Sequence, residues 1–69
     1  MQVTINGNIV EIQTAAISYS TVVVLAGKDP TKNISCICHY RGISASLIFG
    51  DNITVEPYMF FEVIDTSSS

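Results

Sequence analysis

The first twelve residues alternate polar and apolar side chains on either side of an Asn-Gly pair. Residues 2–5 read Gln-Val-Thr-Ile, and the alternation resumes in residues 9–12. A period of two is typical of a half-buried strand, and Asn-Gly accepts the positive φ angles of a tight hairpin turn. The pattern therefore predicts a β-hairpin with its turn at Asn6-Gly7 and with Ile9 facing away from the core.

Residues 17–27 carry signals for both a strand and a helix. The run Val22-Val23-Val24 favours a strand by propensity. Ser18, however, can cap the N-terminus of a helix, and Gly27 stands where helices commonly end in a left-handed residue. Apolar side chains also recur at helical spacing, at Tyr19, Val22, Val23 and Ala26. These signals favour a helix, with a strand as the alternative.

Residues 34–40 alternate again and predict a third strand, in which the two cysteines share one face and Ile37 and His39 share the other. Residues 44–49 are expected to be irregular, with Leu47 as a core anchor. A short strand is predicted at residues 53–55.

Residues 59–64 predict the last strand, with Phe61 and Val63 on one face and with Phe60 and Ile64 on the other. The order strand, strand, helix, strand, short strand, strand indicates an α+β fold of two layers, in which the first and last strands pair side by side. This is the β-grasp arrangement of ubiquitin. We predict a mixed four- to five-stranded sheet packed on one helix, with a domain at residues 1–64 and a flexible tail at residues 65–69.

Composition narrows the possible functions of this 69-residue chain. Its net charge is −3, and its only basic residues are Lys28, Lys32 and Arg41. Binding to nucleic acid or to an anionic membrane surface is therefore disfavoured, because both require a basic patch. The longest apolar run, Val22 to Ala26, is far shorter than the ~20 residues of a spanning helix. The N-terminal residues lack the pattern of a signal peptide, so a cytoplasmic location is expected.

Neither a metal site nor a catalytic site is expected from the cysteines and the histidine. Cys36 and Cys38 lie on the same face of an extended strand and are too far apart for an unstrained disulfide. His39 points to the opposite face, so it forms neither a Cys–His pair nor a third metal ligand with them. We expect two buried free thiols, a solvent-facing histidine, no cofactor and no enzymatic activity.

The ordered set of motifs resembles the bacterial multiubiquitin domain, a ubiquitin-like family. The resemblance runs from Val3 to Thr66 and supports the helix at residues 18–27. The matching positions are Ile5-Asn6-Gly7, Ile17-Ser18-Tyr19, Val22-Val23, Leu25-Ala26, Tyr40-Arg41, Leu47, Gly50, Ile53, Val55, Met59, Phe61, Val63 and Thr66. One departure is Tyr58, where the family usually has glycine.

The resemblance implies a protein modifier or carrier that is joined to a protein target through its C-terminus. Its implied partners are ubiquitin-activating-like and conjugating-like enzymes and a JAB-type metallopeptidase. The implied site is the tail, and it ends in serines where conjugated relatives of ubiquitin have Gly-Gly. The tail residues are Asp65, Thr66, Ser67, Ser68 and Ser69. The alternative is a β-grasp interaction module that is not conjugated and acts as a scaffold or regulator.

A second candidate site is the face of the sheet that the helix leaves open. The alternation of the strands places apolar side chains on that face, and exposed apolar patches often mark partner sites. The predicted partner surface consists of Ile9, Ile37, Phe60 and Ile64.

Overall fold

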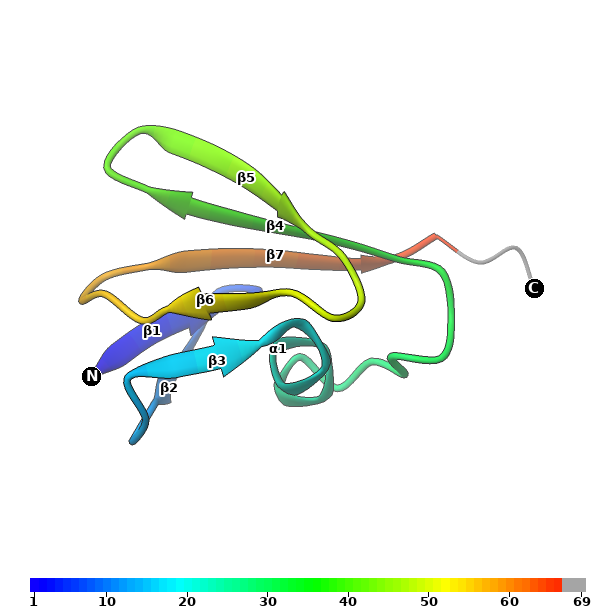
Figure 1. Cartoon of the computed structure of the whole chain (residues 1–69), viewed down its shortest axis with the longest axis horizontal. Coiled ribbons are helices and arrows are strands. Elements are labelled where there is room, and N and C mark those ends of the chain that lie inside the picture. Colours follow the sequence, from blue (N-terminus) through cyan, green and yellow to red (C-terminus); the bar gives the residue numbers. More distant parts are fainter. Residues whose placement is uncertain (67–69) are drawn as a thin grey trace.

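A computed structural model describes residues 1–66 as seven strands and one α-helix (Figure 1). In chain order, the elements are β1 (Gln2–Ile5), β2 (Asn8–Glu11), β3 (Ala16–Ser18), α1 (Tyr19–Leu25), β4 (Ile34–Tyr40), β5 (Ile43–Leu47), β6 (Asn52–Thr54) and β7 (Phe60–Asp65). No helix within the described residues is long and apolar enough to cross a membrane.

Five of the strands form one mixed sheet in the order β2-β1-β7-β4-β5. The chain's first and last strands, β1 and β7, pair in parallel at its centre, and the other pairs in this sheet are antiparallel. Strands β3 and β6 form a separate antiparallel pair. The predicted α+β class, the central pairing of the first and last strands and the single helix are confirmed. The arrangement is compatible with a β-grasp.

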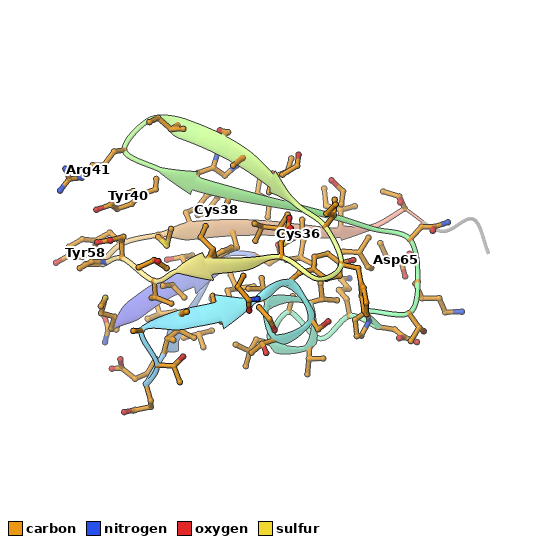
Figure 2. The ribbon with its side chains drawn as sticks, viewed as in Figure 1. Cys36, Cys38, Tyr40, Arg41, Tyr58 and Asp65 are labelled. Carbon is orange, nitrogen blue, oxygen red and sulfur yellow. The ribbon has the colours of Figure 1, made fainter. Side chains whose placement is uncertain are left out.

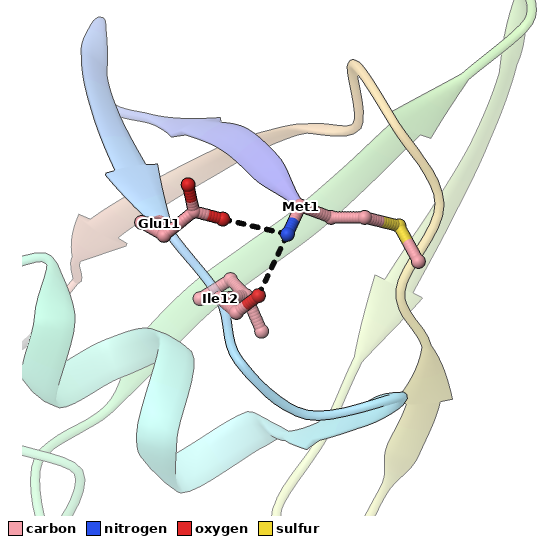
Figure 3. Close-up of polar contacts among 3 residues, drawn as sticks. All are labelled: Met1, Glu11 and Ile12. Carbon is pink, nitrogen blue, oxygen red and sulfur yellow. Dashed lines mark hydrogen bonds and ion pairs between the residues drawn. The ribbon is translucent and has the colours of Figure 1, made fainter.

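The β1–β2 hairpin forms as predicted. Asn6 and Gly7 both have positive φ, at 50° and 82°, which a two-residue type I′ turn requires. At the open end of the hairpin, the N-terminal ammonium group of Met1 donates to a carboxylate oxygen of Glu11 at 2.6 Å and to the carbonyl oxygen of Ile12 at 2.8 Å (Figure 3). These contacts hold the two chain segments together beyond the strands.

Helix α1 begins and ends where the sequence predicts. The Ser18 hydroxyl oxygen accepts a hydrogen bond from the backbone N–H of Thr21 at 3.2 Å, and Gly27 follows the helix with a φ of 77°. The helix buries one face, formed by Tyr19, Val22 and Val23. Tertiary burial of this face thus overrides the strand propensity of three consecutive valines.

The core lies between the sheet and the layer made by α1 and the β3–β6 pair. Figure 1 places this layer over one face of the five-stranded sheet. The fourteen buried apolar residues are Val3, Ile5, Ile12, Ile17, Tyr19, Val22, Val23, Cys36, Cys38, Leu47, Val55, Met59, Phe61 and Val63. The opposite face of the sheet has no covering layer among the described residues.

The structure corrects two predictions about strands. Residues 43–47, expected to be largely irregular, form β5 and pair with β4 from Tyr40↔Ile43 to Cys36↔Leu47. Serine and alanine gave no strand signal there, and the tight turn at Arg41-Gly42 brings the segment beside β4. Strand β3 was also missed, because Ser18 both ends that strand and caps the helix.

The last strand also extends beyond its predicted end at Ile64. Asp65 belongs to β7 and pairs with Ile34. The next residue, Thr66, donates from its backbone N–H and from its hydroxyl group to the carbonyl oxygen of Asn33, at 2.8 and 2.9 Å. The first two residues of the predicted flexible tail are therefore held against the domain.

Candidate functional site

The open face of the sheet is built from side chains that the strand register places in rows. The longest row crosses all five strands through Ile9, Thr4, Phe60, His39 and Ser44. A second row contains Glu62, Ile37 and Ser46, and a third contains Ile64 and Ser35. All four residues of the predicted partner surface lie on this face.

Three of those four residues form a connected apolar band. Ile37 lies opposite Glu62, so Phe60 and Ile64 are its diagonal neighbours on β7. Phe60 is 39% exposed, Ile64 is 54% exposed and Ile37 is half-buried. A partner that binds here would gain most of its apolar contact from two side chains of the central strand.

Ile9 lies apart from this band, although it is 72% exposed. Thr4 stands between Ile9 and Phe60 in the first row. Ile9 instead lines, together with Tyr58 and residues of β1, a groove of about 130 Å³. The predicted surface is thus one band and one separate residue.

A polar cluster in the middle of the open face was not predicted. His39 Nδ1 lies 2.7 Å from the Ser44 hydroxyl oxygen, and His39 Nε2 lies 2.7 Å from Glu62 Oε1. The His39 ring also packs against Phe60, with ring centroids 5.2 Å apart. The contact between Nε2 and Glu62 is close in distance but lacks the geometry of a hydrogen bond, and the buried Nε2 atom has no hydrogen-bond partner among the described residues. This polar cluster borders the apolar band at Phe60.

The signal for this cluster is the cross-strand register, which sequence reasoning missed because it left β5 out. His39 was expected to be an ordinary solvent-facing residue. Once β5 is present, Ser44 lies directly opposite His39. Glu62 is the diagonal neighbour of His39 on β7, because it lies opposite Ile37.

The two cysteines lie on the other face of β4, in the core, as predicted. Both are free and buried. Burial, with a smaller contribution from the neighbouring Cys38, raises the pKa of the Cys36 thiol to about 11. Burial also raises the pKa of Cys38. Protonated, buried thiols are poor nucleophiles, so they are structural residues.

Other groups of the described chain give no metal centre. Within residues 1–66, no three side chains of His, Cys, Asp or Glu come together as a ligand set. An open groove of about 460 Å³ lies at the end of the molecule that carries Tyr40, Arg41 and Tyr58 (Figure 2). Arg41 sits over the Tyr40 ring at 5.3 Å, which directs a positive charge to this end.

Tyr58 has a φ of 66°, a left-handed conformation that glycine adopts most easily. This is the position at which the resembled family usually has glycine. The tyrosine in this left-handed position has its side chain 89% exposed.

The predicted C-terminal site is described only in part. Asp65 and Thr66 lie at the end of β7, as given above. Ser67, Ser68 and Ser69 lie outside the described residues.

Comparison with known proteins assigns neither a family nor a function to this chain. The chain matches no protein-family profile, no curated protein and no solved structure.

Proposed function

We propose that this chain is a ubiquitin-like β-grasp protein that serves as a modifier or carrier and is attached to a protein target through its C-terminus. In this role the chain is the substrate of enzymes. Its partners are an activating-like enzyme, a conjugating-like enzyme and a JAB-type metallopeptidase, and we place it in the cytoplasm. The proposal rests on the sequence resemblance and on a sheet order that fits a β-grasp.

The observation that carries the proposal is the position of β7. This last strand runs through the centre of the sheet and presents Phe60 and Ile64 on the open face. It also leads directly to Thr66, so the docking surface and the C-terminal segment belong to one strand. An enzyme that binds the open face would therefore lie close to the segment on which it acts.

The proposal is tested by intact-mass analysis after incubation with the activating-like enzyme of the producing cell and MgATP. The expected product is a C-terminal adenylate, or a thioester-linked complex with the enzyme. In the control reaction, ATP is replaced by an analogue with a methylene bridge between the α and β phosphorus atoms, which prevents adenylation. An unmodified mass with an enzyme that adenylates its own control substrate would overturn the proposal.

The contribution of the open face is tested in the same assay with Phe60→Ala. This variant should raise the concentration needed for half-maximal adduct formation, because it removes the largest apolar side chain of the band. Val24→Ala is the matched control, since Val24 is 58% exposed on the helix and lies outside the open face. Equal behaviour of the two variants would exclude the open face as the enzyme's docking surface.

The second candidate function is a scaffold or regulator that is not conjugated. It is favoured by the two hydrogen bonds from Thr66 to Asn33, which hold the start of the predicted tail against the domain. A protein of this kind would bind partners through Phe60 and Ile64 without forming an ATP-dependent adduct. Retained binding with no adduct therefore identifies this function.

A further inference from the structure

Strand β5 is an outer strand that lacks the usual protection against pairing with another chain. It pairs with β4 on one side and has no strand on its other side in the described sheet. Its residues, Ile43-Ser44-Ala45-Ser46-Leu47, include no charge and no proline. Natural edge strands usually carry such residues, or a bulge, to prevent edge-to-edge association.

The turn before β5 determines which backbone groups are directed outward. Arg41 and Gly42 have φ values of 51° and 78°, as in a two-residue type I′ turn. In such a hairpin the flanking pair, Tyr40 and Ile43, is the hydrogen-bonded one, and bonded and non-bonded pairs then alternate. Ser44 and Ser46 therefore direct their backbone N–H and C=O groups away from β4, toward solvent.

An apolar groove of about 200 Å³ lies beside this edge, on the helix-facing side of the sheet. Ile43, at its rim, is 72% exposed, and Ala45 is also exposed. The groove is lined by Cys38, Tyr40, Ile43, Ala45, Ile53 and Met59. A strand added to β5 must therefore present apolar side chains on the groove side and small or polar side chains on the open face.

Strand β5 itself has this pattern, with Ile43, Ala45 and Leu47 on the groove side and two serines on the open face. We propose that a second copy of this chain pairs with β5, antiparallel and about a two-fold axis at Ala45. Each Ser44 then lies opposite the Ser46 of the other copy, and their outward backbone groups form hydrogen bonds. Ile43 of one copy lies opposite Leu47 of the other and covers it on the groove side.

Charge at the ends of the strand fits this antiparallel arrangement. The turn before β5 carries the basic Arg41, and the turn after it carries the acidic Asp51. Antiparallel pairing brings the basic end of one copy toward the acidic end of the other, whereas parallel pairing would place like charges together. The open face with Phe60 and Ile64 is left uncovered, so this inference does not depend on the proposed function.

The first test is sedimentation velocity of the full chain from low micromolar to millimolar concentration, where a reversible dimer is expected. Ser46→Pro removes the outward N–H and leaves the β4 pairing intact, because position 46 does not donate to β4. Two backbone hydrogen bonds are lost per dimer, so the dissociation constant should rise about tenfold or more. Ser46→Ala is the control and should dimerise like the unmodified chain.

The second test fixes the register by disulfide formation. In the proposed dimer, Ala45 faces its own counterpart as a non-hydrogen-bonded pair, with Cα atoms ~4.5 Å apart, which a disulfide accepts. Ala45→Cys should therefore form a covalent dimer under mild oxidation. Ser46→Cys, the adjacent control, should react much more slowly, because its two copies are offset along the strands. The unmodified chain, reduced first and then oxidised in the same way, measures the background of covalent dimer that the native cysteines form.

Any of three results would overturn the inference. The first is a monomer at every concentration, and the second is equal rates of covalent dimer formation for Ala45→Cys and Ser46→Cys. The third is a dimer that is unaffected by Ser46→Pro, which would exclude β5 as its interface.

Discussion

The side chain of Asn6, in the turn after β1, is hydrogen-bonded to the backbone of Val63 in β7, 57 residues away in sequence. Its Nδ2 donates to the carbonyl oxygen of Val63 at 2.9 Å, and its Oδ1 accepts from the backbone N–H of Val63 at 2.8 Å. The amide thereby imitates the backbone of one more strand residue and continues the parallel β1–β7 pairing beyond Ile5. Asn6 both forms the hairpin turn, with its positive φ, and holds the central strand in register.

We expect Asn6→Gly to lower the free energy of unfolding by about 1–3 kcal/mol. Glycine preserves the turn, but it leaves the part-buried N–H and C=O of Val63 without their partners. Urea unfolding followed by circular dichroism measures the change. Asn8→Ala is the control, because Asn8 is exposed at the start of β2. A variant as stable as the unmodified chain would show that these two bonds contribute nothing net.

Tyr58→Gly should raise the free energy of unfolding by roughly 0.5–1 kcal/mol. A left-handed conformation costs an L-residue about 1–2 kcal/mol, of which the greater flexibility of glycine in the unfolded chain offsets part. The tyrosine side chain is 89% exposed, so little burial is lost. Tyr58→Ala separates the two effects, because alanine keeps the unfavourable φ. Thermal unfolding of both variants measures the difference. Equal melting temperatures for the glycine and alanine variants would show that the left-handed backbone at position 58 does not lower stability.

Phe60→Ala should weaken partner binding about tenfold or more while changing the free energy of unfolding by less than about 1 kcal/mol. The ring is 39% exposed and contacts His39 on the surface, outside the core. Phe61→Ala is the contrasting variant, since Phe61 is fully buried and its truncation should cost about 3–5 kcal/mol of stability. Unfolding of Phe60→Ala would mean that the open face is structural.

The raised pKa of Cys36 predicts a loss of stability at alkaline pH. Its pKa of about 11, against an ordinary value of 9.0 for a cysteine thiol, means that the folded state holds the thiol proton more tightly than the unfolded state. The unfolded chain therefore binds fewer protons between these two values, so the free energy of unfolding falls as pH rises from 9 toward 11. Below pH 9 this contribution is fully present.

Cys36→Ala should show a shallower decline in that pH range in urea unfolding, because groups other than the thiol titrate alike in both proteins. At pH 8, the native chain should also react slowly with a thiol reagent such as dithionitrobenzoate until urea unfolds it. Identical pH profiles of the two proteins, or fast labelling of the native chain, would contradict a buried and protonated Cys36.

Much of the local structure was predictable because its signals act over a few residues. Asn6-Gly7 indicated the hairpin, and Ser18 and Gly27 indicated the ends of the helix. The alternation of apolar residues also fixed which side of β4 and β7 is buried, including the position of the cysteines. The composition of Ile43 to Leu47 carried no such signal, since two serines and an alanine favour neither a strand nor burial.

The sequence by itself determined the α+β class, the position of the hairpin and the helix, and the face on which Phe60 and Ile64 lie, because each depends on periodicity or on local backbone chemistry. Only the tertiary structure decided that β5 exists, that Ser44 and Glu62 meet at His39 and that Thr66 is held by Asn33. These contacts join residues on different strands or distant segments, and their geometry is set by register. Register is a property of strands already paired, which no short stretch of sequence specifies.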